Sequence, residues 1–196
     1  MTSEVDKIEL DLTHPIGILM GEHDIILQTL GDLRTLIGQV GFSDGPDKVS
    51  AQLHSLKALA ECLLDAEPHH LREEEVIFPR LEWRGITGPT EQMRREHEEL
   101  RAKKRRLLQL SEEAVGINFL EFAGEVKEVG GYIVDTLEQH INKENNVLYR
   151  IALRDFYPDE WSEVMAEFNE IGYCCFTPQL PGAPRPEAQW KLSASE

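Results

Sequence analysis

Six histidine and glutamate side chains recur along the chain in an order that suits a metal centre. A single histidine is followed by a His-x-x-x-Glu pair, and the same order then repeats, giving His23, His70, Glu74, His97, His140 and Glu144. Residues four apart on a helix project from one face, so each pair can present both side chains to one point. Imidazole nitrogens and carboxylate oxygens without thiolates favour non-haem iron, with manganese or zinc as alternatives.

These six side chains lie on apolar helix faces and are therefore expected in a core. His23, for example, falls between Met20 and Leu27. Burying two carboxylates without partners would cost several kcal/mol each. A centre in which Glu74 and Glu144 bridge two cations, with two histidines on each cation, removes that cost. The sequence therefore predicts a site for two metal ions with room for a small exogenous ligand.

Other polar residues near these positions receive different interpretations. His69 and Glu73 have the same four-residue spacing, but their row has no equivalent in the later helix. We expect this pair at the surface or just outside the metal ligands. His14 is expected to be a helix-terminus or capping residue. Tyr132 and Tyr149 could both lie near the site, but tyrosines on long helices are usually packing residues.

Four long amphipathic helices must position the candidate ligands. Apolar residues recur at three- and four-residue steps over residues of about 15–40, 49–82, 90–112 and 116–153. Short turns separate these segments, and Pro68 is expected to kink the second helix because proline cannot donate a backbone hydrogen bond. The pattern predicts an all-α fold, an up-down-up-down four-helix bundle. A short fifth helix at about 158–171 and a proline-rich tail should follow.

The second half of the bundle looks like a copy of the first. Aligning His70 with His140 also aligns Glu74 with Glu144, and the segment around His23 matches the segment around His97. The chain is therefore interpreted as a duplicated helical hairpin. We expect one bundle domain over residues 1–173 and a separate tail over 174–196.

Composition excludes several kinds of partner. The chain has 36 acidic and 20 basic residues among 196, giving a net charge of −16, which opposes binding to nucleic acid or to an anionic membrane surface. No apolar run approaches the length of a membrane span, and the first ten residues lack the order of a signal peptide. Three cysteines without a CxxC motif suit a reducing compartment. We expect a cytoplasmic protein.

At the candidate ligands, the sequence resembles the hemerythrin-like, or HHE cation-binding, family over residues of about 14–173. The stretches HPIGILMGEHDIIL and HHLREEEVIFPRLE are similar to a bacterial and archaeal subgroup whose members often carry a PAS sensor domain after the bundle. The family's metal ligands map onto the six residues named above. The resemblance therefore implies two non-haem iron ions held by a helical bundle.

Two departures from the oxygen-carrying members narrow what the resemblance implies. Those proteins have a His-x-x-x-His in the third helix and a His-x-x-x-x-Asp in the fourth, where this chain has Met93 and Asn145. The pattern is more similar to iron-centre repair proteins of nitrosative stress and to iron- and oxygen-sensing hemerythrin domains. It implies a protein that binds or reduces O2, NO or peroxide in a response to oxygen or nitrosative stress.

Two alternatives to this function remain. One is an iron- or oxygen-dependent regulatory module that signals to a partner without catalytic turnover. The partner would be another protein or a second copy of the chain in a homodimer. The other is a metal-free helical interaction domain, in which the duplicated histidines and glutamates have no ligand role.

Overall fold

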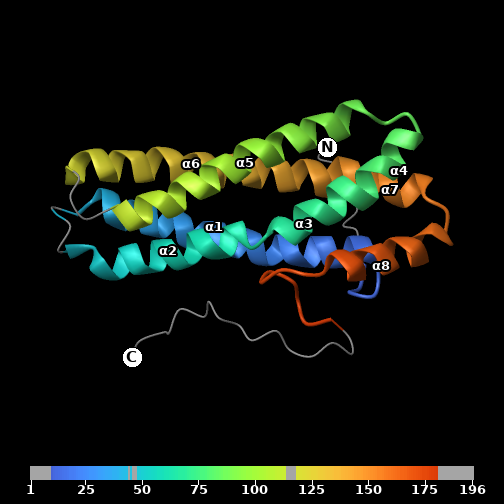
Figure 1. Cartoon of the computed structure of the whole chain (residues 1–196), viewed down its shortest axis with the longest axis horizontal. Helices are drawn as coiled ribbons and strands as arrows, with labels where there is room; N and C mark the ends of the chain where they lie inside the picture. The colour runs from blue at the N-terminus through green and yellow to red at the C-terminus, as the bar shows by residue number, and fades with distance from the viewer. Residues whose placement is uncertain (1–9, 44, 46–47, 114–117, 181–196) are drawn as a thin grey trace, which may run out of the picture.

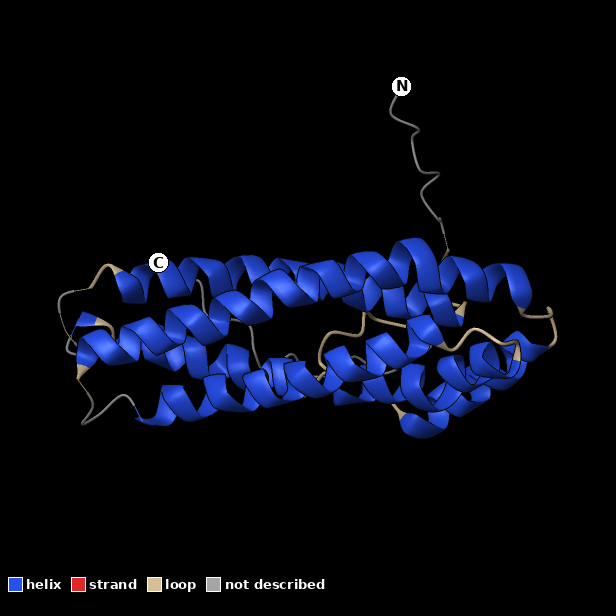
Figure 2. Cartoon of the chain, turned by 90° about the horizontal axis from the view of Figure 1, so that it is seen from above, coloured by secondary structure: helices blue, strands red, loops and turns tan. Residues whose placement is uncertain are grey.

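The computed structural model describes residues 10–43, 45, 48–113 and 118–180, and within these residues helices are the only regular elements (Figures 1 and 2). Four helical rods run along the long axis. The first is α1 (Pro15–Gly41) and the third is α5 (Gly88–Glu113). The second consists of α2 (Ser50–Leu64), α3 (Glu67–Arg72), η2 (Glu73–Ile77) and α4 (Phe78–Trp83). The fourth consists of α6 (Phe119–Lys143), η3 (Glu144–Leu148) and α7 (Tyr149–Asp155), and α8 (Glu160–Ile171) follows it.

The rods pack as a four-helix bundle, which confirms the predicted fold class. Helix α1 packs against α2 and α6, and α5 packs against the same two helices. Helix α8 lies beside one end of the bundle, where it contacts α1, α3 and η2 (Figure 1). Every helix of the described residues falls short of the length and apolarity that crossing a membrane requires.

Local sequence explains where the long helices begin. His14 caps α1, because its Nδ1 accepts a hydrogen bond from the backbone N–H of Ile16 at 3.1 Å, and Pro15 opens the helix without needing a donor. The predicted capping role of His14 is therefore confirmed. Asn118 caps α6 in the same way, with its Oδ1 accepting from the N–H of Leu120 at 3.2 Å.

Two irregularities interrupt the second and fourth rods near the candidate ligands. Helix α2 ends at Leu64, and α3 begins at Glu67 with Pro68 in its first turn, so the predicted interruption at this proline is present. Further along, η2 and η3 are single π-helical turns, in which the N–H of Phe78 bonds to the carbonyl of Glu73 and that of Tyr149 to the carbonyl of Glu144. A π turn inserts one extra residue into a helix and occurs frequently at functional sites.

Two apolar clusters form the core. The larger cluster includes Leu30, Leu63 and Leu107 from three of the rods. The smaller one includes Tyr149 and Phe168, so α8 completes it. Beyond α8, the segment 174–180 returns along the bundle and its Cys174 and Phe176 join the larger cluster. These residues belong to the tail predicted over 174–196, and its later part, 181–196, lies outside the described residues.

Two glycines of α1 should respond in opposite directions to alanine. A Cβ at Gly17 would overlap the backbone carbonyl of Asp11, whereas a Cβ at Gly31 would meet open space. We expect Gly17→Ala to lower the free energy of unfolding by about 1–3 kcal/mol, because a backbone atom cannot move aside easily. Gly31→Ala should raise it by up to about 1 kcal/mol through helix propensity. Urea unfolding followed by circular dichroism measures both, and equal effects would contradict the close approach at Gly17.

Candidate metal centre

Two overlapping groups of ligating side chains lie in the middle of the bundle. One contains Glu73, His97, His140 and Glu144, and the other contains His23, His69 and Glu144. Within each group the candidate ligand atoms lie within 4.8 Å of one another, and all six side chains are buried. All four rods contribute, and Glu144 belongs to both groups. The cluster could therefore hold metal ions.

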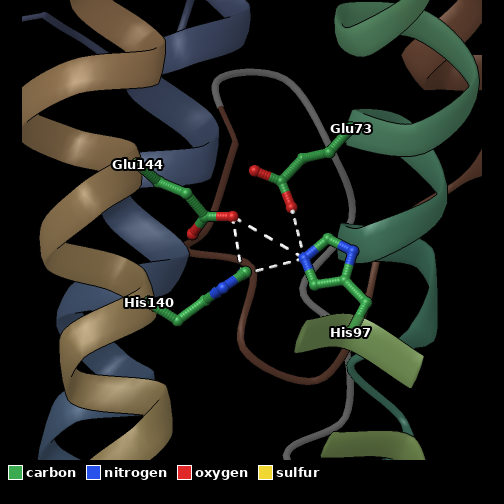
Figure 3. A group of neighbouring side chains, drawn as sticks. All are labelled: Glu73, His97, His140 and Glu144. Carbon is green, nitrogen blue, oxygen red and sulfur yellow. Dashed lines mark hydrogen bonds and ion pairs between the residues drawn. The ribbon is translucent and has the colours of Figure 1, made fainter. Parts of the chain in front are cut away.

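In the first group, two imidazoles and two carboxylates converge (Figure 3). The Nε2 atoms of His97 and His140 lie 2.8 Å apart. Oε1 of Glu144 lies 2.7 Å from Nε2 of His140 and 3.6 Å from Nε2 of His97. From the opposite helix, Oε2 of Glu73 lies 3.5 Å from Nε2 of His97.

In the second group, another pair of imidazoles lies close to the same two carboxylates, although only Glu144 belongs to both groups. The Nε2 atoms of His23 and His69 lie 3.1 Å apart. The other oxygen of Glu144, Oε2, lies 3.2 Å from Nε2 of His23, and Oε2 of Glu73 lies 3.6 Å from Nε2 of His69. Each glutamate carboxylate therefore lies close to both histidine pairs. A carboxylate that bridges two metal ions requires this position.

Hydrogen bonds on the outer side fix the orientation of the four imidazoles. Each ring donates through Nδ1 to a side-chain oxygen, and the pairs are His69 with Glu22 at 2.6 Å, His140 with Glu96 at 2.7 Å, His97 with Glu74 at 2.6 Å and His23 with Asn145 at 2.9 Å. A histidine held by its Nδ1–H presents the Nε2 lone pair to a metal ion, and such outer partners raise its basicity. All four Nε2 atoms therefore face the centre as potential ligands.

The outer carboxylates are themselves held in the ionised form. Burial would raise the pKa of Glu22, but the hydrogen bonds and charges of His69 and Arg72 outweigh it and lower the pKa to about 2. The pKa of Glu96 is also lowered to about 2, since its hydrogen bonds to His140 and Lys143 outweigh the effect of burial. Both groups are therefore acceptors at neutral pH.

The inner carboxylates lack the partners that their burial requires. Oε2 of Glu73 and both oxygens of Glu144 accept no hydrogen bond of good geometry in the described residues. Burial, followed by the charge of Glu144, raises the pKa of Glu73 well above its usual range. The pKa of His140 is raised to about 9, because Glu144 and Glu96 outweigh the opposing effect of burial. Cations between the carboxylates would satisfy these oxygens, so the residues present fit a metal centre.

An aromatic residue stacks on one histidine of each pair. The ring of Tyr149 lies over His23 with centroids 5.6 Å apart, and Phe78 lies over His97 at 6.0 Å. The hydroxyl of Tyr149 donates to Oε1 of Glu73 at 2.6 Å, which confirms that this tyrosine lies near the site. Burial and the nearby charge of Glu73 raise the pKa of the phenol, so it remains a hydrogen-bond donor.

Four of the six predicted residues meet in this cluster, and two do not. His23, His97, His140 and Glu144 belong to it. The carboxylate of Glu74 is 16 % exposed and binds the outer side of His97, and the ring of His70 stacks on His97 with centroids 4.0 Å apart. Neither residue joins the two groups of ligating atoms.

His69 and Glu73 occupy the places predicted for His70 and Glu74. Their expected position at the surface is wrong, since they are 3 % and 0 % exposed. The prediction continued the apolar row of the second helix past Pro68 without a change of helical phase, but the chain leaves the helix at Asp65 and Ala66 and restarts at Glu67. This break shifts the helical phase by one residue. The segment beginning at His69 then corresponds to the segment beginning at His140, and both glutamates open π turns.

The fold and donor set define a helical bundle with a buried cluster of histidine and glutamate that suits a metal cofactor. The chain belongs to the hemerythrin family, because the model of the hemerythrin HHE cation binding domain matches residues 14–152. No curated protein matches the chain. The family resemblance of the sequence is thereby confirmed.

Proposed function

We propose that the protein is a non-haem di-iron protein that binds or reduces a small ligand, O2, NO or peroxide, in a response to oxygen or nitrosative stress. The observation that carries this proposal is the position of Glu73 and Glu144, each of which approaches both histidine pairs. His23 with His69 would hold one ion, and His97 with His140 the other. Manganese and zinc are the alternative metals.

The chain's own residues suit this role in three ways. Bound iron would supply redox chemistry and open coordination positions. The outer carboxylates orient the imidazoles, and Tyr149 holds the carboxylate of Glu73 in place through its 2.6 Å hydrogen bond. Apolar residues such as Ile26 and Leu137 line a cavity of 10 Å³ beside the cluster, which is space for about one water molecule. Access of bulk water to the site is therefore restricted.

Metal analysis and spectroscopy test the proposal. We expect about two iron ions per chain after reconstitution, as in other di-iron carboxylate bundles. The oxidised protein should show ferric absorption that bleaches on reduction and changes on exposure to O2 or NO. A single zinc ion, no metal, or iron without any response to these gases would contradict the proposed chemistry.

A regulatory module without turnover is the second candidate, and the end of the described chain favours it. The hydroxyl of Thr177 donates to Oε1 of Glu22, whose other oxygen holds His69. A change at the metal centre could therefore reach the segment after α8, and from there a partner or a second copy of the chain. Partner binding that is identical for the apo and iron-loaded proteins would count against this role. Under either candidate we place the protein in the cytoplasm, since its three cysteines are free thiols.

A further inference from the structure

Lys104 is a buried cation close to the metal cluster. It lies on α5 two helical turns after His97, on the same face of the helix, and only 2 % of its surface is exposed. Among the described residues no carboxylate pairs with its ammonium group. Glu67, the strongest acidic influence on it, is instead bound by Arg101 at 2.7 Å. Burying an ammonium without a paired anion is costly, so its presence here requires an explanation.

The explanation lies in the cavity that Lys104 shares with the metal cluster. The cavity has a volume of 10 Å³. Its lining includes four cluster residues, namely His23, His69, His140 and Glu144. Lys104 and His70 also line it, and the other lining side chains are apolar. A ligand at the cluster would therefore have an ammonium group and an imidazole as its polar neighbours.

His70 adds a second polar group that lacks a partner. It is buried, and its Nδ1 forms no hydrogen bond among the described residues. The nearest carboxylate oxygen, on Glu67, is 3.9 Å away. The ring is held in position by stacking on His97 at an interplanar angle of 13°. Lys104 and His70 thus line the same cavity without forming a hydrogen bond to each other.

The charge of the groups that line the cavity determines whether it suits an anionic or a neutral ligand. Burial lowers the pKa of Lys104 to about 8, and the opposing charges of Glu67 and Glu144 limit the decrease, so most of the ammonium stays protonated at pH 7. Two metal cations at the cluster would face this positive charge across a medium of low dielectric constant. A neutral diatomic molecule would leave that repulsion unchanged, whereas a small anion between the two would reduce it.

We propose that Lys104 and His70 form a subsite for a small inorganic anion beside the metal cluster, and that Lys104 strengthens the binding of anionic ligands without affecting that of neutral ones. The inference rests on the proposed metal-binding function and specifies the ligand class of that site. Lys104 acts by direct contact with the ligand, and His70 contributes a further polar atom.

Azide binding to the iron-loaded protein tests the proposal. We compare the wild type with Lys104→Met, which removes the charge at similar volume, and with Lys103→Met, which removes the neighbouring charge that lies over the ring of Tyr132 at the surface. Lys104→Met should weaken azide binding about 10–100-fold, the loss expected for one hydrogen bond to a charged group. NO binding to the reduced protein should be unchanged, and Lys103→Met should match the wild type for both ligands.

Elemental analysis and circular dichroism accompany each titration. Equal azide affinity in Lys104→Met and the wild type, at equal iron content, would overturn the anion subsite and leave the di-iron proposal intact. An equal loss of azide and NO affinity would also overturn it, because general damage to the pocket would then be the cause. A wild-type chain that binds no iron would overturn both proposals. Lys104→Gln provides a second uncharged variant, and the same selective loss of azide affinity is expected from it.

Discussion

Replacing Glu73 by glutamine is expected to remove most of the bound metal, whereas the same replacement at Glu74 should leave most of it in place. Glu73 lies 3.5 Å from His97 and 3.6 Å from His69, so its carboxylate can bridge the two ions. Glu74 contacts only the outer Nδ1 of His97. Loss of an outer partner typically lowers metal affinity about 10–100-fold, and loss of a bridging ligand should cost more.

Metal content per chain, measured by elemental analysis after dialysis against a weak chelator, distinguishes the two variants. The comparison is well matched, because the residues are adjacent and the chemical change is the same. The apo form of Glu73→Gln should melt no lower than the wild type, since burial already raises the pKa of Glu73 and favours its neutral form. If Glu74→Gln lost the metal and Glu73→Gln kept it, the originally predicted pair of His70 and Glu74 would be the ligands instead.

A second large effect is expected at the buried ion pair between Arg72 and Glu22. Both residues are 0 % exposed, and one guanidinium nitrogen donates to both carboxylate oxygens at 2.7 Å. Arg72→Met should lower the free energy of unfolding by about 3–5 kcal/mol, because it leaves a buried carboxylate without its cation. Arg34→Met is the matched control, since Arg34 binds Glu138 with both distances at 3.0 Å but is 56 % exposed. The control should cost less than about 1 kcal/mol.

The pH dependence of the stability difference between the wild type and Arg72→Met tests independently whether charge causes it. The pKa of Glu22 falls from 4.5 to about 2 in the folded protein, where its partners outweigh the effect of burial. A lowered carboxyl pKa stabilises the fold above pH 4.5, and the stabilisation is lost as the pH falls towards 2. The stability gap between the wild type and Arg72→Met should therefore narrow over that range. A gap that stayed constant from pH 6 to pH 3 would show that packing, and not charge, explains the effect of Arg72.

Most of the fold could be predicted from sequence because long amphipathic helices leave a strong periodic signal. The first helix was expected at about residues 15–40 and spans Pro15–Gly41, and the fifth was expected at about 158–171 and spans Glu160–Ile171. The periodic signal also placed His23 and His97 on the buried faces, since α1 and α5 contain no interruption near them.

The same reasoning could not predict which residues of the second rod face the core. Helical periodicity assumes 3.6 residues per turn, and a break or a π turn shifts every later residue around the axis. A signal for the true register is nevertheless present in the sequence. Aligning His69 with His140 also places Arg72 opposite Lys143 and pairs Val76 with an identical residue. Basic residues are needed at both positions, because each holds the outer carboxylate of a histidine.

The contacts of α8 and of the segment after it show that the folded unit extends beyond the residues that the family model matches. That match ends at residue 152, yet the guanidinium of Arg72 lies 5.3 Å from the ring of Phe168 and 5.0 Å from that of Tyr173. Thr177 binds Glu22 from the same segment. A fragment cut at the boundary of the match would uncover this ion pair and admit water next to His69. We therefore expect that a fragment must extend at least to Thr177 to keep the centre intact.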